Sequence, residues 1–332
     1  MRDFGAKVDG TTDDSTAINL AESTIAADGG GILVFPTGTT IAGSMLIKRG
    51  DIIWQGAGIG ASVIKAKDGV SMNWLVSTLN ADSLWGTNSV SGEYAFALRD
   101  ITLDGNKAGG AHCGGFGIYG ATFNLENYEI ANCTGAGLRT EFGIPGIIPH
   151  GYNSQSNSTN ALIHDCDGVG IIWGGPSDPS IVNNNIYRNQ PYNMMTQVNG
   201  TGCKIINSHC WGSVFDSRLA TKAIELNTSG NLIMNSVFEG ATVHQVHMRS
   251  SGNVLMGGIY YFSDPEGTVY GVTLGDAGIP VSNNTIKTKI DNCKLGGSTS
   301  STTRASTTST STASSSQPTA LPTRGRRPLP LA

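Results

Sequence analysis

The sequence predicts an all-β protein built as a parallel β-helix, in which successive coils of the chain stack on one another. The composition is the first observation that supports this fold. The chain has 332 residues, of which 45 are glycine, and charged residues make up only 14% of it, against about a quarter in typical soluble proteins. Abundant Gly and Asn favour turns with positive φ, while scarce Lys and Glu disfavour long helices.

A loose internal repeat is the second observation. Residues 127–138 and 160–171 share one pattern: apolar, any residue, Asn or Asp, Cys, any residue, Gly, any residue, Gly, apolar. The pattern continues with drift as far as Cys293, and successive copies start 20 to 33 residues apart. A period of this size predicts a solenoid whose coils each contribute two or three short strands. Equivalent residues of neighbouring coils would then lie about 4.8 Å apart.

The repeat predicts two inward-facing aliphatic ladders. The first contains Ile130, Ile163, Ile186, Ile206, Val237, Ile259 and Ile290, and the second contains Leu138, Ile171, Met194, Ile224, Val246 and Val272. Cys133 and Cys166 would share a turn column as small buried side chains, with Cys293 further along. None of the six cysteines forms a CxxC pair, so the sequence gives no support for a metal or redox site.

The ends of the chain differ from the repeats. Residues 15–27 carry Ile18, Ala21 and Ile25 at helical spacing, with Asp14 or Ser15 available as N-cap, and a helix there would cover the open first coil. A glycine triplet, an apolar strand at 32–35 and Pro36 follow. Residues 298–332 consist mainly of Ser, Thr, Pro and Arg, which predicts a disordered tail. We therefore expect one β-helix domain over residues 1–297 and a tail over residues 298–332.

Three segments carry a resemblance to a known superfamily. The turn, helix, glycine break and strand of residues 3–36, the coil at Gly50–Ile64 and the run Arg99–Asn106 resemble pectate-lyase-like right-handed β-helix proteins. Within that superfamily the chain is most similar to phage tailspike-type polysaccharide depolymerases, and more distantly to mannuronan C5-epimerases and polygalacturonases. The resemblance implies a right-handed, single-stranded parallel β-helix with a short N-terminal capping helix. It also implies a polysaccharide ligand and a homotrimer.

The motifs that distinguish the reactions within this superfamily are largely missing. After Gly135-Ala136-Gly137 the C5-epimerases carry an Asp-Pro-His-Glu catalytic run, whereas this chain has Arg139-Thr140-Glu141-Phe142. The polygalacturonase signature is also absent. Leu138–Gly143 and Gly175–Asp178 are similar to coils of the phage-type subset. The resemblance therefore predicts the scaffold more strongly than the reaction.

The predicted register places polar residues together on one outer face. If the second ladder points inward, one outward column contains Arg139, Ile172, Met195, Glu225 and His247, and the next contains Glu141, Gly174, Gln197, Asn227 and Arg249. Carboxylates one or two coils apart would be separated by about 5 to 9.5 Å, the range that glycosidases use. The long insertions at 142–160 and 211–222 would flank this face.

These considerations give two sets of candidate residues, each with a structural alternative. Glu141, Asp178, Glu225 and Asp167 are candidate catalytic acids, although Glu141 could only pair with an arginine and the two aspartates could only form turns. Candidate substrate-binding residues are Arg139, Trp173, Trp211, His247 and Arg249. Both tryptophans are candidates because an aromatic face stacks on the apolar face of a sugar, and packing beneath a loop is their alternative role.

Endo-glycosidic hydrolysis by Glu141 and a second acid is the first functional expectation. Uronate β-elimination by Arg139, His247 and Arg249 is the second, and a non-catalytic glycan-binding or structural spike is the alternative of another class. No cofactor is expected, and calcium would be expected only for a lyase.

The net charge is −4, and the first 297 residues alone carry −8, which argues against nucleic-acid and anionic-membrane partners. The sequence shows neither a secretory signal nor an apolar run that could span a bilayer. A virion tail or an extracellular location fits these features.

Overall fold

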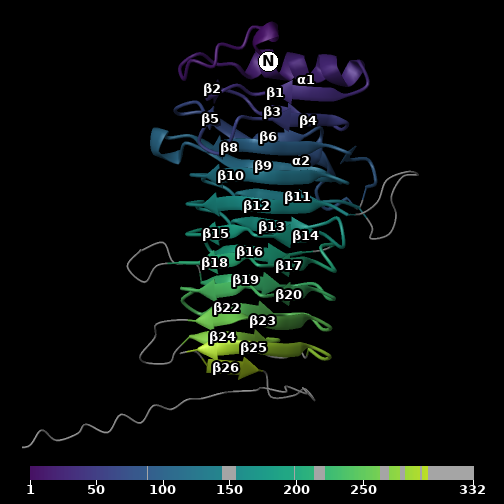
Figure 1. Ribbon diagram of the computed structural model, residues 1–332, viewed down its shortest axis with the longest axis vertical. Helices are drawn as coiled ribbons and strands as arrows, with labels where there is room; N and C mark the ends of the chain where they lie inside the picture. Colours follow the sequence, from purple (N-terminus) through teal and green to yellow (C-terminus); the bar gives the residue numbers. More distant parts are fainter. Residues whose placement is uncertain are drawn as a thin grey trace, which may run out of the picture.

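The computed structural model describes residues 1–87, 89–143, 155–197, 199–212, 221–261, 269–276, 281–291 and 294–297. Within these residues the chain forms a stack of coils, with the N-terminal helix at one end and the last strands at the other (Figure 1). Strands of neighbouring coils pair in parallel and in register. The predicted right-handed parallel β-helix with a capping helix is confirmed. The predicted tail at 298–332 and Cys293 lie outside the described residues.

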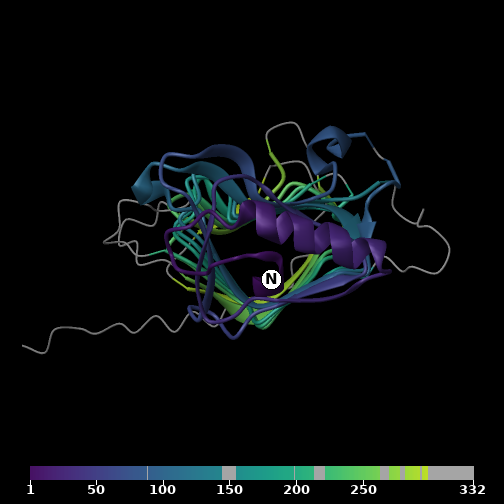
Figure 2. The ribbon, with the colours of Figure 1, turned by 90° about the horizontal axis from the view of Figure 1, so that it is seen from above.

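Two sheets form the walls of the coil, as the view along the stack shows (Figure 2). Sheet A contains β1 (Gly31–Val34), β2 (Gly38–Ala42), β4 (Ile52–Gln55), β5 (Ser62–Ala66), β8 (Ala97–Asp104), β10 (Asn124–Ala131), β12 (Asn157–His164), β14 (Ser180–Val182), β15 (Asn185–Tyr187), β17 (Lys204–Ile206), β18 (His209–Trp211), β20 (Leu232–Met234), β21 (Val237–Glu239), β23 (Val254–Tyr261) and β25 (Thr285–Asp291).

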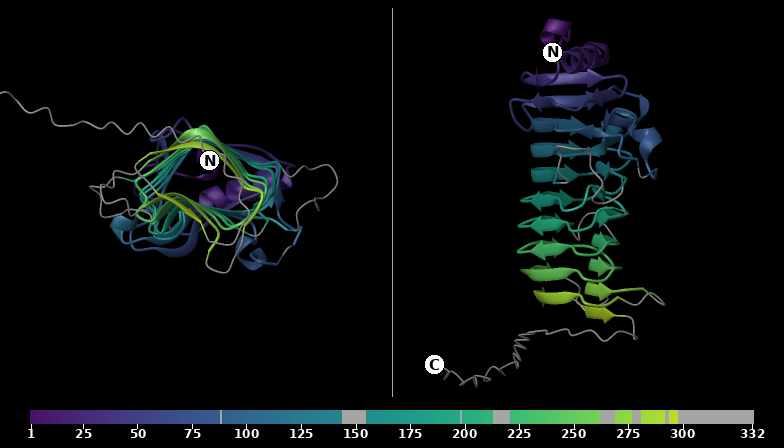
Figure 3. Two further views of the ribbon diagram at one scale, coloured as in Figure 1. Left: turned by 90° about the horizontal axis from the view of Figure 1, so that it is seen from below. Right: turned by 90° about the vertical axis from the view of Figure 1, so that its right-hand side faces the viewer.

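Sheet B forms the other wall, with one strand from each coil stacked along the axis (Figure 3). It contains β3 (Leu46–Lys48), β6 (Ser71–Thr78), β7 (Glu93–Tyr94), β9 (His112–Ala121), β11 (Leu138–Glu141), β13 (Ile171–Gly174), β16 (Tyr192–Thr196), β19 (Lys222–Leu226), β22 (His244–Met248), β24 (Tyr270–Leu274) and β26 (Lys294–Gly297). The helical segments are η1 (Arg2–Phe4), α1 (Ser15–Ala27), α2 (Ala81–Leu84) and η2 (Lys107–Gly109).

The second predicted ladder is confirmed along its whole length. Its residues align strand by strand through sheet B, and all of them are fully buried: Leu138, Ile171, Met194, Ile224, Val246 and Val272. Burying a side chain of this size stabilises the fold by about 1.5 to 3 kcal/mol. This ladder fixes which residues of sheet B face outward, because side chains alternate along each strand.

The first predicted ladder is correct for three coils and wrong for the next three. Ile130, Ile163 and Ile186 align, but the inward column then continues through Cys210, Phe238 and Tyr260 before it reaches Ile290. The predicted members Ile206, Val237 and Ile259 belong to positions on the outer surface. The long strand β12 gives way to two short strands per coil, so a bend interrupts the alternation that the prediction assumed. An offset of one residue is enough to turn a side chain to the opposite face.

The N-terminal helix covers the first coil, as predicted (Figure 2). Ile18 and Ala21 are fully buried, and Ile25 packs against the same core. Asp14 occupies the N-cap position but makes no capping bond; its carboxylate accepts the N–H groups of Lys7 and Val8, at 2.7 and 2.9 Å. The helix thus shields strand edges that would otherwise be open.

The turns are held by side chains that repeat from coil to coil. Cys133 and Cys166 are buried free thiols at equivalent turn positions, as predicted. A column of amides links the later coils: the N–H of Asn231 donates to the side chain of Asn253 at 3.0 Å, and that of Asn253 donates to Asn284 at 2.8 Å. These bonds satisfy turn N–H groups that the strands leave unpaired.

Ile171→Ala should destabilise the protein by about 2 to 4 kcal/mol, because it leaves a cavity in the middle of the buried ladder. The matched control is Ile172→Ala, one residue along the same strand but on the outer face, where we expect a loss below about 1 kcal/mol. Urea unfolding followed by circular dichroism measures both. Equal losses for the two variants would contradict the assigned orientation of β13.

Candidate functional site

The outer face of sheet B carries two aligned columns of outward side chains. Arg139, Ile172, Met195, Glu225 and His247 are paired strand by strand, so the predicted outward column is confirmed. Thr273 of β24 continues it. Neighbouring members are one coil apart, which brings Glu225 and His247 into contact.

A second column on this face was not predicted. Tyr192, Lys222, His244 and Tyr270 align at the start of four successive strands. Each lies three residues before a member of the first column. The sequence contains a signal for this spacing, because Lys222-Ala-Ile-Glu225 and His244-Gln-Val-His247 place polar residues at the same two positions. The signal is short, and only the pairing register reveals that these residues form one patch.

Glu225 is the centre of this patch. It is only 2% exposed, and its carboxylate contacts Lys222 Nζ, Asn227 Nδ2 at 3.0 Å, and both His247 Nδ1 and Arg249 Nη1 at 3.6 Å. Burial by itself would raise the pKa of Glu225. The interaction with His247 and the hydrogen bonds from Lys222 and Asn227 outweigh the burial and lower the pKa of Glu225 to about 2. Glu225 is therefore an anion that holds three basic side chains in place.

Asp276 supplies a second carboxylate at the far side of His247. Its Oδ1 lies 3.1 Å from His247 Nε2, and its Oδ2 lies 2.5 Å from Arg249 Nε. His247 and Arg249 therefore each contact both carboxylates and link Asp276 to Glu225. Asp276 was not predicted as a site residue, because it follows β24 in a segment without a recognisable motif.

His244 differs in charge from its neighbours. Burial, followed by the positive charges of His247 and Lys222, lowers the pKa of His244 to about 4. Its Nδ1 is 2.8 Å from Thr273 Oγ1, and its ring lies 4.7 Å from that of His247. The patch thus contains a neutral imidazole at neutral pH, beside two permanent cations. We refer to Tyr192, Lys222, Glu225, His244, His247, Arg249, Tyr270 and Asp276 as the Glu225 cluster.

The predicted pairing of Glu141 with a second acid on this face is not supported. Glu141 is 4% exposed; its Oε1 accepts the N–H of Gly86 at 2.5 Å, and its Oε2 lies 3.2 Å from Arg139. Its strand is three coils from that of Glu225, a distance of about 14 Å, which exceeds the separation of either glycosidase geometry. Glu141 is buried beneath the segment that follows α2 rather than open to a substrate.

Two further candidate acids lie in turns rather than on the face. Asp178 is exposed, adopts a left-handed φ of 58° and donates its N–H to Thr201 O at 2.8 Å. Asp167 is exposed and pairs with Lys107 at 3.1 Å. Both therefore match the structural alternative that their sequence context offered, and neither contacts the Glu225 cluster.

The two predicted aromatic platforms are also not on this face. Trp173 points into the core, is fully buried and donates its indole N–H to Pro176 O at 2.9 Å, so its face cannot receive a sugar. Trp211 belongs to β18 of sheet A and stacks on Tyr187 at 4.5 Å. Trp173 lies two residues after the inward Ile171 on β13, so it shares the inward direction, whereas Trp211 lies on a strand of the other sheet. The predicted flanking insertions fall mostly on residues 144–154 and 213–220, which lie outside the described residues.

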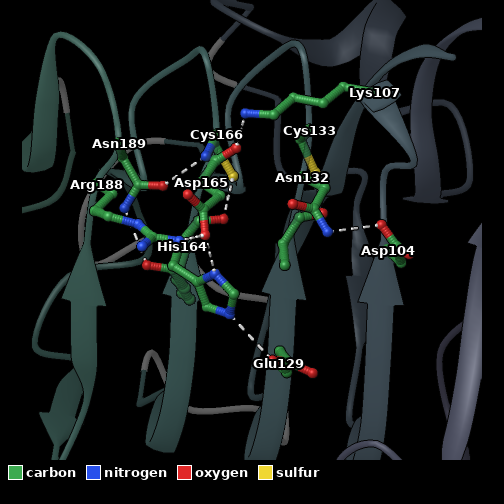
Figure 4. Close-up of polar contacts among 12 residues, drawn as sticks. Asp104, Lys107, Glu129, Asn132, Cys133, His164, Asp165, Cys166, Arg188 and Asn189 are labelled. Atoms are coloured by element: carbon green, nitrogen blue, oxygen red, sulfur yellow. Dashed lines mark hydrogen bonds and ion pairs between the residues drawn. The ribbon is translucent and has the colours of Figure 1, made fainter. Parts of the chain in front are cut away.

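Sheet A carries a separate polar cluster around His164 (Figure 4). Its Nε2 lies 3.0 Å from Glu129, its Nδ1 lies 2.8 Å from Asp165, and Arg188 also pairs with Asp165. The His164 ring stacks on Tyr187 at 4.6 Å. These contacts join three neighbouring coils and leave both ring nitrogens of His164 engaged, which favours a structural role.

A calcium ion, expected only for a lyase, does not fit the Glu225 cluster. Calcium takes six to eight oxygen ligands, whereas Lys222, His247 and Arg249 surround both carboxylates. No group of three or more His, Cys, Asp or Glu side chains in the described part of the chain is arranged to hold a metal. In the same part of the chain, no helix is long and apolar enough to cross a membrane.

The unfolding free energy should fall as pH rises above about 6.5, because His164 loses a proton that its two carboxylates hold. Burial would lower the pKa of His164, but the bonds to Glu129 and Asp165 raise it overall. Its stabilisation is therefore complete below the unfolded pKa of about 6.5 and is lost through the raised folded pKa. Urea unfolding at a series of pH values measures the slope, which His164→Gln should flatten. His209→Gln, also on sheet A, is the control; a wild-type slope in His164→Gln would contradict the assignment.

Comparison with known proteins places the chain among polysaccharide-related proteins. Residues 1–214 match the family described as rhamnogalacturonase A/epimerase, pectate lyase-like. Mannuronan C5-epimerase AlgE3 of Azotobacter vinelandii is 31% identical over 205 residues, which cover 57% of this chain and 10% of that protein. Alginate lyase 7 of the same organism is 31% identical over 116 residues, 32% of this chain and 12% of that protein. The chain thus spans only a small part of these relatives.

Solved structures share the fold. The A-module of mannuronan C5-epimerase AlgE4 from Azotobacter vinelandii superposes with a TM-score of 0.68 at 17% identity, covering 92% of this chain and 99% of that module. The enzymatically active domain of tailspike protein 2 from bacteriophage CBA120 gives 0.62 at 12% identity, covering 88% of this chain and 42% of that one. Together with the match over residues 1–214, they place this chain in the rhamnogalacturonase A/epimerase family of pectate lyase-like right-handed β-helix proteins.

Proposed function

We propose that this protein degrades a uronate-containing polysaccharide by β-elimination at the Glu225 cluster on the outer face of sheet B. The observation that carries the proposal is the side-by-side arrangement of cations and a neutral imidazole on one outward patch. Lys222 and Arg249 can neutralise a sugar carboxylate, and His244 can accept a proton beside them. A paired-carboxylate mechanism at Glu141 is not favoured, because its carboxylate is nearly buried and is engaged by the Gly86 N–H and Arg139.

In the proposed β-elimination, the side chains of the Glu225 cluster have different roles. A uronate carboxylate bound by Lys222 and Arg249 makes the hydrogen at C5 more acidic. His244 removes that proton, the electron pair forms a C4–C5 double bond, and the C4–oxygen bond breaks. The departing oxygen takes a proton from a hydroxyl of the same column, Tyr192 or Tyr270. Glu225 keeps the two cations apart and oriented, since it contacts both.

The comparisons support a uronate rather than a neutral sugar. Two of the relatives are named for mannuronan C5-epimerisation and for alginate lysis. Exchange of configuration at C5 requires removal of the same C5 hydrogen that β-elimination removes. The Asp-Pro-His-Glu run that the epimerases carry is replaced here by Arg139–Phe142, so we place the proton acceptor at His244 instead.

Hydrolysis is the second candidate, and one observation favours it. Glu225 and Asp276 place two carboxylates on either side of His247, and hydrolysis by paired acids needs two carboxylates in one site. Against it, the lowered pKa of Glu225 suits a base or nucleophile, whereas hydrolysis also needs a protonated acid. Hydrolysis therefore remains a proposal of lower rank.

We further propose a virion-tail or extracellular location, with the polysaccharide as partner. Sheet A offers a contact for the homotrimer that the resemblance implies. Val182, Ile206, Met234 and Met256 form an outward apolar column over four coils, and Met256 is 41% exposed. Sedimentation at micromolar concentration should give a trimer. A monomer would contradict the proposed trimer and would not affect the proposal for the Glu225 cluster.

His244→Asn should lower kcat on sodium alginate or polygalacturonate by about 10²- to 10⁴-fold, because it removes the proton acceptor with little change in size. The measurement is the ultraviolet absorbance of the new double bond, which is conjugated with the carboxylate. His209→Asn on sheet A is the matched control and should retain full activity.

Three outcomes would count against the elimination mechanism. New reducing ends without new absorbance would indicate hydrolysis and would direct attention to Glu225 and Asp276. Full activity in His244→Asn would exclude it as the base. Binding of polymer with no shortening, seen by size-exclusion chromatography, would instead support a non-catalytic spike.

A further inference from the structure

We infer that Arg139 forms a distal carboxylate-binding subsite on the outer face of sheet B, three coils from the Glu225 cluster, and that this subsite sets the length of glycan the protein prefers. The inference rests on the proposed function, because it takes the ligand to be a uronate chain. It gives Arg139, a candidate substrate-binding residue from the sequence, a defined ligand group and a distance from the Glu225 cluster.

Arg139 is held in one orientation. Its guanidinium lies 4.4 Å from the centre of the Trp85 ring, and its Nη2 lies 3.2 Å from Glu141. Trp85 is itself fixed, because its indole N–H and that of Trp74 both donate to Asp82 Oδ1 at 3.1 Å. An arginine fixed by a ring and a carboxylate loses little side-chain freedom when it binds an anion.

Arg139 also remains available to a ligand. Its side chain is 32% exposed, whereas that of Glu141 is 6% exposed and lies beneath it. A guanidinium has five N–H donors in a planar fork that matches a carboxylate, and one of its nitrogens meets Glu141. The remaining donors can bind a sugar carboxylate from the solvent side.

The surface between the two charged sites suits a sugar chain. Ile172 and Met195 occupy the two positions between Arg139 and Glu225 in the same outward column, so the floor there is apolar. Three coils correspond to about 14 Å, which an extended chain of roughly three pyranose residues would span. The apolar faces of these sugars would lie on the floor while a carboxylate at each end meets a cation.

This arrangement gives Glu141 a different task from the one its sequence context predicted. Glu141 binds the N–H of Gly86 with one oxygen and Arg139 with the other, so it ties the covering segment to the arginine. It acts as a positioning residue rather than a catalytic one. Its effect should therefore appear in KM and not in kcat.

The test uses the full chain with uronate oligosaccharides of two to six residues prepared from alginate and from polygalacturonate. Arg139→Gln should raise KM by about 10- to 100-fold for the longer oligosaccharides, the loss of a charged hydrogen bond, and leave kcat unchanged. For the shortest oligosaccharides, which cannot span three coils, KM should not change. Arg139→Lys should restore part of the affinity, and Arg188→Gln on sheet A is the matched control. Thermal unfolding of each variant shows whether the fold is retained.

The outcomes separate this inference from the proposed function. If the wild-type protein cleaves and Arg139→Gln has the same KM at every length, the subsite is wrong and the enzyme stands. If the wild type is retarded in gels that contain either polymer but does not cleave it, weaker retardation of Arg139→Gln supports the subsite while the reaction fails. A wild type that neither binds nor cleaves either polymer overturns both.

Discussion

The in-register parallel stacking of coils is the constraint on which the rest of this structure depends. Each residue of a strand lies about 4.8 Å from its equivalent in the next coil. The direction in which a side chain points in one coil is therefore repeated at the equivalent positions along the axis. The buried ladder from Leu138 to Val272 shows this for the core. The same repetition brings outward residues from strands 20 to 30 positions apart in sequence into direct contact.

Stacking concentrates charge as well as apolar side chains. Two equivalent side chains on adjacent coils are forced together, so columns of like charge would repel, and the charged carboxylates of the Glu225 cluster each lie beside basic side chains. Glu225 lies among Lys222, His247 and Arg249, and Asp276 completes the network. Such mutual neutralisation keeps an ionised carboxylate on a nearly buried position, and it holds the basic groups in fixed positions facing the solvent.

The His164 cluster on sheet A and the Glu225 cluster on sheet B differ in how their histidine side chains are engaged. Around His164, both ring nitrogens are engaged by carboxylates and the ring is stacked on Tyr187, so its contacts join coils. On sheet B, His244 stays neutral because burial and neighbouring positive charge oppose its protonation. A neutral imidazole next to fixed cations is suited to proton transfer, whereas a histidine held between two carboxylates is suited to linking strands. This difference is the physical reason why we propose the site on sheet B rather than on sheet A.

The sequence by itself determined the fold class, the capping helix at 15–27, the ladder from Leu138 to Val272 and the outward column through Glu225 and His247. It could do so because hydrophobic alternation and glycine turns are local properties that each coil repeats. It misplaced Ile206 and Trp211, because strand boundaries in short, bent coils move a side chain to another face or wall. It also misplaced Trp173, although the alternation with Ile171 already pointed that side chain inward. Lys222, His244 and Asp276 were not among its candidate residues, and it offered Glu141 as a candidate catalytic acid. Only the tertiary structure decided these points, because they depend on pairing between strands rather than on any single stretch of chain. Pairing sets which segment buries a side chain, how many coils separate two carboxylates, and which charges surround an imidazole.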